Sequence, residues 1–268
     1  MKSIIANLHL IYFSATGTTK KIADAICRQL PAAETHEYNL ADVHDLAVPL
    51  PLPQDSLTVI AVPVHRGRVP QLIVEKLQDL RSDGSPAVIV CVYGNRDYDD
   101  ALLEMLDIAT DSGFNVIGGG AFIGEHSYST DAYPIARNRP DEEDLAQCKH
   151  FAQELSTKIL DNPDYANLCR IIVPGTAPYK AHPVVAPLSP ETIAANCTLC
   201  GTCAEVCPSN AVSVGTIVTT DKDLCIWCCA CVKSCPEQSR VFYDNRIEGF
   251  SKKLSVSCSE RKEPEWFM

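Results

Sequence analysis

The sequence predicts an α/β domain built on a doubly wound, five-stranded parallel sheet, followed by a small α+β domain. Three observations support this prediction. Strand-like apolar runs alternate with helix-like segments through residues 4–160, a proline-rich stretch follows, and a cysteine pattern then occurs twice. Alternating strands and helices are typical of a parallel sheet with helices on both faces.

Five segments have the composition of strands. Ile4–Phe13, Leu57–Val64 and Ala87–Tyr93 are mostly apolar runs, which favour strands buried on both faces. Phe114–Ile123 is also strand-like, and a weaker strand is expected near Thr35–Leu40. The N-terminal text MKSIIANLHLIYFSATG is therefore interpreted as the first buried strand, not as a secretory signal.

Four segments between and after these strands have apolar residues at helical spacing. They are Thr18–Leu30, Gln71–Leu80, Asp99–Asp111 and Asp141–Leu160. Each helix follows a strand, as a parallel sheet requires, because its crossover connections are normally helical.

The chain divides into four parts on this basis. Residues 1–162 form the α/β domain, and residues 163–190, with six prolines, form a semi-rigid linker. Residues 191–250 form the cysteine-rich domain, and residues 251–268 form a polar, basic tail that either is loosely ordered or packs back on the protein.

Charge and hydropathy exclude several classes of partner. The net charge is −11, which argues against nucleic acid. Residues 1–165 carry 24 acidic and 13 basic side chains, whereas residues 166–268 carry ten of each, as suits two domains with different roles. No apolar run reaches the roughly 18 residues of a membrane span. We expect a cytoplasmic protein because no export signal is visible.

The fourteen cysteines are concentrated near the C-terminus, with nine between Cys197 and Cys235. Four of them have the spacing C-x2-C-x2-C-x3-C-P, and the whole pattern recurs 28 residues later. The two copies are Cys197, Cys200, Cys203, Cys207 and Cys225, Cys228, Cys231, Cys235. Over residues 191–245 the chain resembles the bacterial ferredoxins with two [4Fe–4S] clusters, in which the fourth cysteine of each run binds the other cluster.

This resemblance implies two metal sites, each built from both copies. We define the first cysteine set as Cys197, Cys200, Cys203 and Cys235, and the second cysteine set as Cys225, Cys228, Cys231 and Cys207. Structural zinc also uses paired C-x2-C, but zinc does not explain three successive steps, the C-P ending or their repetition. Cys229 is out of register and is interpreted as a small buried thiol, while Trp227 either shields a cluster from water or simply packs.

A loop of small and hydroxyl residues joins the first strand to the first helix. Its residues are Ser14, Ala15, Thr16, Gly17, Thr18 and Thr19, followed by Lys20. Backbone N–H groups at a helix N-terminus bind anions. The loop lacks the endings of a Walker loop and of a dinucleotide fingerprint. Instead it resembles the flavodoxin loop [ST]-x-T-G-x-T that holds the FMN phosphate, and the resemblance extends over about residues 4–160. The alternative is a hydroxyl-rich helix cap without a ligand.

A flavodoxin-like fold places the flavin outside the carboxyl ends of the strands. The resemblance then assigns the flavin ring to the loops after the third and fourth strands. The predicted contact residues are Pro63, Val64, His65, Arg66 and Gly67 in the first loop, and Tyr93, Gly94, Asn95, Arg96 and Tyr98 in the second. Tyr93 or Tyr98 could stack on the flavin or pack at the surface, and His65 could contact the ring or face solvent.

Arginines at Arg66, Arg68 and Arg96 are unexpected in an acidic domain. Two hypotheses remain open for them: they favour reduced, anionic flavin, or they dock an acidic partner. On the first hypothesis, replacing Arg66 or Arg96 by Gln lowers the FMN potential.

The combination resembles flavodoxin–ferredoxin fusion proteins and implies electron transfer between redox partner proteins. No catalytic residue is predicted for such a carrier. The alternative is a flavin-dependent reductase of a small acceptor such as a quinone or porphyrin, with a pocket lined by His126, Tyr128 and Tyr133. A third possibility, an iron–sulfur protein with an idle phosphate loop, ranks last.

Overall fold

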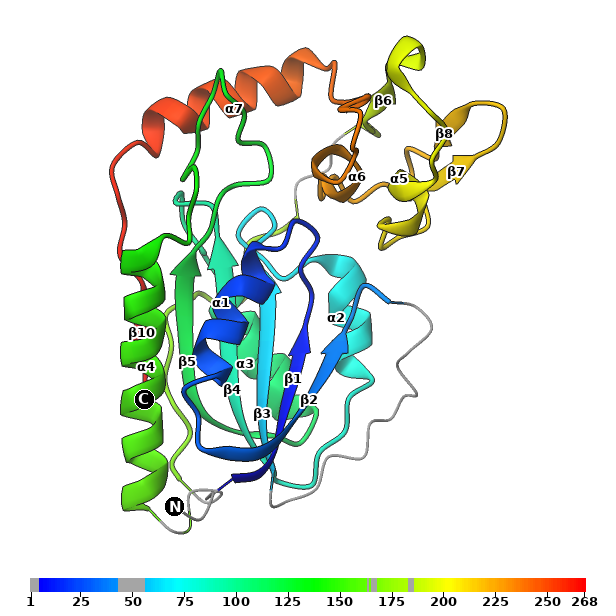
Figure 1. The fold of residues 1–268 in the computed structure, drawn as a ribbon. Coiled ribbons are helices and arrows are strands. Elements are labelled where there is room, and N and C mark those ends of the chain that lie inside the picture. Colours follow the sequence, from blue (N-terminus) through cyan, green and yellow to red (C-terminus); the bar gives the residue numbers. More distant parts are fainter. Residues whose placement is uncertain (1–4, 43–55, 163, 165–167, 183–185) are drawn as a thin grey trace.

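The computed structural model describes residues 5–42, 56–162, 164, 168–182 and 186–268. Ile4, Pro163 and Pro183, which belong to the expected first strand and linker, lie outside these residues. The described chain forms a large α/β domain and a smaller cysteine-rich domain beside one end of its sheet (Figure 1).

The α/β domain is built on one six-stranded sheet. Five of its strands are parallel: β1 (Ile5–Tyr12), β2 (Ala32–Asn39), β3 (Ser56–Pro63), β4 (Pro86–Tyr93) and β5 (Asn115–Ile123). Their spatial order is β2-β1-β3-β4-β5, which is the flavodoxin-like order of doubly wound sheets. The predicted fold class is therefore confirmed.

Helices cover both faces of this sheet. They are α1 (Thr18–Cys27), α2 (Gln71–Gln78), α3 (Ala101–Asp111) and α4 (Glu142–Asp161). Helices α1 and α4 pack on one face, and α2 and α3 pack on the other. This burial of both faces explains why β3 and β4 are almost continuously apolar. Within the described residues, no helix combines the length and apolarity needed to cross a membrane.

The sixth strand comes from the C-terminal tail. Strand β10 (Glu265–Phe267) pairs antiparallel with β5 at the sheet edge. The sequence left the position of the tail open, and the structure shows that it packs back. Gly120 of β5 permits this approach, because a Cβ there would lie only 3.1 Å from the Glu265 carbonyl oxygen and 3.2 Å from Trp266 Cβ.

The cysteine-rich domain contains two small antiparallel sheets and short helices. Strand β6 (Glu191–Thr192) pairs with β9 (Arg240–Val241), and β7 (Val212–Val214) pairs with β8 (Val218–Thr220). The helices are a 3-10 turn (Ala194–Asn196), α5 (Thr202–Glu205), α6 (Ala230–Lys233) and α7 (Asn245–Ser257). Helix α7 spans residue 250, which is the predicted boundary between the cysteine-rich domain and the tail.

The cysteine repeat is also a structural repeat. Gly201 and Cys229, which are 28 residues apart, are the left-handed N-caps of α5 and α6, with φ values of 88° and 63°. Leu199 and Trp227, also 28 residues apart, are likewise both left-handed, with φ values of 56° and 61°. The two copies therefore have the same local backbone, and differences between their side chains reflect different surroundings.

The described part of the linker packs against α3. Ile171 and Val173 are buried in the core of the α/β domain. Asp100, just before α3, accepts hydrogen bonds from the backbone N–H groups of Thr176 at 2.9 Å and Lys180 at 2.6 Å. These contacts attach the chain leading to the cysteine-rich domain to the sheet domain.

Candidate functional site

The predicted phosphate loop lies between β1 and α1, at the carboxyl end of the sheet. Gly17 is the N-cap of α1, with φ 88°, and no side chain caps this helix end. The first turn of α1 contains no acidic residue. Ser14 Oγ accepts a hydrogen bond from the Lys20 backbone N–H at 3.0 Å, which closes the loop on itself. An uncapped helix N-terminus without nearby carboxylates is suited to an anion.

The loop after β3 is a tight turn. Backbone hydrogen bonds join His65 and Arg68 in both directions, at 2.9 and 3.1 Å. Arg66 and Gly67 between them have φ values of 57° and 82°, so both central residues are left-handed, as in a type I′ turn. Gly67 is required here, because a Cβ would lie 2.1 Å from the Asp99 carboxylate.

The three arginines near these loops have different surroundings. Arg68 forms a nearly buried ion pair with Glu104 at 2.6 Å, and its guanidinium lies over the Tyr179 ring of the linker. Arg96 pairs with Asp99. Arg66 is exposed and lies over the Trp227 ring of the cysteine-rich domain, 4.5 Å from its centroid.

The loop after β4 is engaged mainly by the protein itself. Tyr93 and Tyr98 are only 4% and 7% exposed, and their rings pack together in the core. The Tyr98 hydroxyl donates to Glu265 of the tail. Gly94 lies against the His126 imidazole, since a Cβ at Gly94 would be 2.3 Å from His126 Cδ2. The aromatic side chains of this loop are thus placed in the core, and its backbone remains for a ligand.

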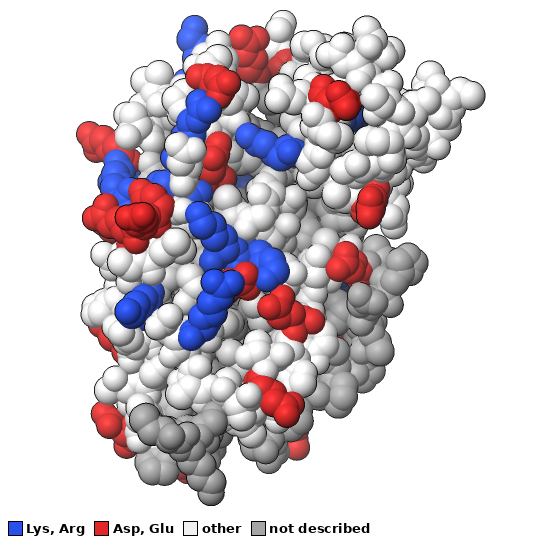
Figure 2. Space-filling view, in the orientation of Figure 1, with Lys and Arg blue, Asp and Glu red and all other residues white. Residues whose placement is uncertain are grey.

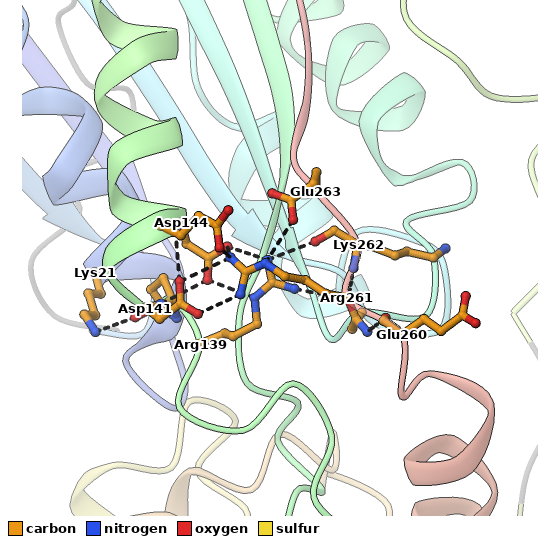
Figure 3. Close-up of polar contacts among 11 residues, drawn as sticks. Lys21, Arg139, Asp141, Asp144, Glu260, Arg261, Lys262 and Glu263 are labelled. Atoms are coloured by element: carbon orange, nitrogen blue, oxygen red, sulfur yellow. Dashed lines mark hydrogen bonds and ion pairs between the residues drawn. The ribbon is translucent and has the colours of Figure 1, made fainter.

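The Asn95 side chain bonds to the C-terminal tail and does not face an open surface. Its amide donates to the carbonyl oxygens of Cys258 and Glu260 at 2.8 and 2.7 Å. Its side-chain oxygen accepts from the Lys262 backbone N–H and from the Arg139 guanidinium. Figure 3 shows the neighbouring network, in which Arg139 and Arg261 reach the carboxylates at the start of α4.

The loop after β5 meets the cysteine-rich domain. Tyr128 packs edge-on against Phe242 and Phe250, with ring centroids 6.1 Å apart in each case. His126 Nδ1 accepts a hydrogen bond from the Tyr128 backbone N–H at 3.1 Å. Tyr133 lies apart from this pair and donates to Glu248 of α7. The structure brings His126 and Tyr128 together but does not bring Tyr133 to them.

His126 makes the stability of the protein depend on pH. Burial, with smaller contributions from Arg96 and Lys233, lowers the pKa of His126 to about 4, so its imidazole is neutral at pH 7. The unfolded chain binds this proton near pH 6.5, and stability is therefore complete above that pH and lost toward pH 4. We expect a loss of about 1–2 kcal/mol between pH 7 and pH 5, measured by urea unfolding. Burial also lowers the pKa of His65 to about 4, so His126→Gln should make this part of the profile less steep without flattening it, and an unchanged slope would contradict the assignment.

The first cysteine set surrounds one cavity. Cys197, Cys200, Cys203 and Cys235 all line one hollow that is open to solvent. Three of these thiols come from the first copy and the fourth from the second copy, as the crossed assignment requires. Cys200 is exposed, and Cys203 is 8% exposed. The hollow therefore has an open side at the protein surface.

The second cysteine set is more enclosed. Burial is the main cause that raises the pKa of Cys228 to about 12; a backbone hydrogen bond from Ala230 opposes the rise, and the thiols of Cys231, Cys207 and Cys225 add smaller contributions to it. These four cysteines are thus close enough to affect one another, and they too come from both copies. Such thiols ionise at neutral pH only beside a strong positive charge, which iron–sulfur ligation supplies.

Backbone N–H groups donate to the fourth cysteine of each copy. Cys207 Sγ accepts from the Ala211 N–H at 3.2 Å, and Cys235 Sγ accepts from the Ser239 N–H at 3.3 Å. The Ser239 hydroxyl also lies 3.2 Å from Cys235 Sγ, a contact that Ala211 cannot make. Hydrogen bonds to ligand sulfurs raise cluster potentials.

Ser239→Ala should therefore lower the reduction potential of the centre held by the first cysteine set, on the order of tens of millivolts. The measurement is an anaerobic redox titration followed by absorbance and electron paramagnetic resonance. Ser209→Ala is the matched control, because its hydroxyl lies farther from a ligand sulfur, 3.8 Å from Cys207 Sγ. Equal shifts in the two variants would contradict the assignment.

Arg240 is a site residue that the sequence did not single out. It is 2% exposed, lines the cavity of the first set and approaches Cys231 Sγ of the second set at 3.8 Å. Its guanidinium donates to Thr192 and Thr220 at 2.7 and 2.8 Å. The repeat itself contains a signal for this residue. A charged side chain stands at Arg240 where the first copy has the apolar Val212, 28 positions earlier, and Val212 is buried.

One family model matches part of the cysteine-rich segment. Residues 190–213, which contain the first cysteine run, match a family described as a 4Fe-4S binding domain. No curated protein matches the chain.

Three solved structures illustrate the similarity of the sheet domain. A flavodoxin of Streptococcus pneumonia TIGR4 is 18% identical, with TM-score 0.39, over 57% of this chain and 99% of that one. A Fusobacterium nucleatum flavodoxin bound to flavin mononucleotide is 15% identical, with TM-score 0.40, over 57% and 98%. An azoreductase from Bacillus anthracis is 10% identical, with TM-score 0.39, over 57% and 99%. Our fold assignment rests on the strand order, not on these scores.

The strand order and the family match define the class of the protein. The chain joins an α/β domain with the flavodoxin-like strand order to a segment that matches a 4Fe-4S binding domain family, as the resemblance predicted.

Proposed function

We propose that this protein transfers electrons between protein partners through two [4Fe–4S] clusters and one FMN bound in the same chain. The observation that carries the proposal is the hollow lined by Cys197, Cys200, Cys203 and Cys235, three from one copy of the repeat and one from the other, in a chain whose sheet has the flavodoxin-like strand order. When bound, the clusters pass single electrons and the flavin takes one or two. A reducing, cytoplasmic location would suit cysteines that serve as metal ligands and not as disulfides.

The residues present fit both cofactors. Four thiols converge on the open cavity, and the donor set is all sulfur, which suits iron–sulfur clusters. The uncapped N-terminus of α1, with Ser14, Thr16 and Thr19 around Gly17, would hold the FMN phosphate. The turn from Pro63 to Gly67 and the backbone at Gly94 would flank the ring, while Tyr93 and Tyr98 would support it from the core.

The stoichiometry of the metal tests the first half of the proposal. Anaerobic reconstitution should give about eight iron atoms per chain. Cys235→Ala and Cys207→Ala should each remove one cluster, whereas Cys229→Ala should keep both. Zinc bound without visible absorbance, or the loss of iron in Cys229→Ala, would contradict the ligand assignment.

Flavin binding tests the second half. FMN fluorescence should be quenched on titration with the protein, and Gly17→Val should weaken this binding while leaving the iron content unchanged. The reason is that a β-branched residue at φ 88° strains the turn by roughly 1–2 kcal/mol and displaces the N–H groups. Equal FMN affinity in this variant would place the phosphate elsewhere.

The alternative function is a flavin-dependent reductase of a small acceptor. The carrier is favoured because Tyr128 packs on Phe242 and Phe250, and Tyr133 bonds to α7, so these side chains are engaged by the other end of the chain. Titration of the loaded protein with NADH, NADPH and a reduced ferredoxin separates the two functions. Reduction by the ferredoxin alone supports the carrier, and catalytic oxidation of a pyridine nucleotide supports the enzyme.

A further inference from the structure

The two cysteine sets do not have equivalent positions relative to the sheet domain. Figure 1 shows α6, which carries Cys231, on the side nearer the sheet, with β7 and β8 on the far side. Ile226, between two ligands of the second set, packs against the core of the α/β domain. On the first set, Cys200 is exposed and the cavity opens to solvent.

The repeat shows where this asymmetry arises. Leu199 and Trp227 occupy the same place in the two copies, with nearly the same φ. Leu199 is 42% exposed, whereas Trp227 lies under the Arg66 guanidinium at 4.5 Å. Arg66 belongs to the turn after β3, which the proposed function assigns to the flavin ring. Trp227, the residue that replaces leucine in the second copy, therefore contacts the turn that the proposed function assigns to the flavin ring.

Other contacts support the same orientation. Lys233 of α6 donates to the Ser129 carbonyl oxygen at 2.7 Å, which fixes α6 to the loop after β5. Tyr128 of that loop packs against Phe242, which follows β9. In Figure 2 the part of the cysteine-rich domain that faces the viewer carries few charged side chains, whereas charged side chains of both signs lie over the sheet domain.

We propose that Trp227 and Arg66 are positioning residues that hold the second cysteine set against the flavin loop, and that the first cysteine set faces outward to an external one-electron carrier protein. This inference rests on the proposed function. With the clusters and FMN bound, one-electron oxidation of the donor protein would deliver its electron to the cluster held by the first cysteine set, and the Trp227 contact would bring the cluster held by the second set close to the flavin. Two donor molecules, each oxidised by one electron, and two protons from solvent would balance the two-electron reduction of FMN.

The test is flash photoreduction of the loaded, anaerobic protein by a photochemically generated deazaflavin radical, followed at cluster and flavin wavelengths. We expect Trp227→Ala and Arg66→Gln to slow internal transfer about fivefold or more, because the cation–π contact that holds the docked orientation is lost. Arg66→Lys should restore most of the rate, since it keeps a cation over the ring. Reduction by a purified, dithionite-reduced two-cluster ferredoxin should slow in Leu199→Ala, with no change in the internal step.

The outcomes separate this inference from the proposed function. Iron and FMN contents are measured first in every variant, and their absence from the wild type would contradict the proposed function itself. If both cofactors are bound, two results overturn the inference: an unchanged internal rate in Arg66→Gln, or a slower internal rate in Leu199→Ala only. Arg66→Gln keeps the test decisive if Trp227→Ala fails to assemble its clusters, because Arg66 is exposed and lies in the other domain.

Discussion

Arg139→Gln should lower the free energy of unfolding by about 3–5 kcal/mol, as expected when one partner of a buried ion pair is removed. Arg139 and Asp144 side chains are only 6% and 2% exposed, and the Arg139 Nε donates to Asp144 at 2.8 Å. The same guanidinium donates to the Lys262 carbonyl oxygen at 2.9 Å and to Asn95 (Figure 3). The substitution leaves a buried carboxylate without its main counter-ion.

The location of this pair explains why the effect extends beyond one contact. Asp144 forms the capping box of α4 with Asp141, and Arg261 of the tail bonds to both carboxylates. Lys21 of α1 donates to the Pro140 carbonyl oxygen beside them. The network thus joins the tail, the start of α4 and the loops after β4 and β5. Loss of Arg139 should also loosen β10, which would be seen as a red shift of Trp266 emission in a Trp227→Phe background.

The matched control is Arg137→Gln, two residues away. Arg137 pairs with Asp131 at the surface, where the side chains are 46% and 91% exposed. Exposed pairs contribute about 0–1 kcal/mol, so urea unfolding followed by circular dichroism should show almost no change. Similar losses in the two variants would mean that the buried network adds nothing beyond a surface ion pair.

The sequence was sufficient for the sheet because burial on both faces leaves a clear signal. The apolar runs at β3 and β4 could be assigned as strands without knowing their neighbours. Strand β10 gave no such signal. It has three residues, one of them Glu265, and it pairs with the small residues Gly119, Gly120 and Ala121 of β5. Its formation depends on tertiary contact, which local composition does not encode.

The cysteine repeat could be recognised from the sequence and the contacts around it could not, for a related reason. Ligand spacing is a local property of the chain, whereas the partners of Asn95 and Tyr98 come from the distant tail. The repeat, however, contains more than its cysteines. At two of the positions where the copies differ, Val212 against Arg240 and Leu199 against Trp227, the side chain of the second copy makes a polar or cation–π contact.

Arg240→Met should lower the reduction potentials of the clusters held by the two cysteine sets by about 50–100 mV. The substitution removes a buried positive charge between the two sets. Arg240 approaches Cys231 of the second set at 3.8 Å and lines the cavity of the first set. Its Nε has no hydrogen-bond partner among the described residues, which leaves this donor for a charged neighbour. Reduction adds one negative charge to a cluster, and a nearby buried cation stabilises that charge. Methionine keeps most of the volume and removes the charge.

Potentials separate this electrostatic role from a purely structural one. Anaerobic titrations of Arg240→Met and Arg240→Lys should show a large shift in the first variant and a smaller one in the second, because lysine keeps the charge but not both threonine hydrogen bonds. Arg246→Met is the control, since Arg246 is exposed and pairs with Asp244. If the iron content is retained and the potentials of Arg240→Met and Arg246→Met both match the wild type, the guanidinium only braces β9 against its neighbours. A shift that occurs in Arg240→Met but not in Arg246→Met, and that is partly reversed in Arg240→Lys, means that this buried cation raises the reduction potentials of the clusters held by both cysteine sets.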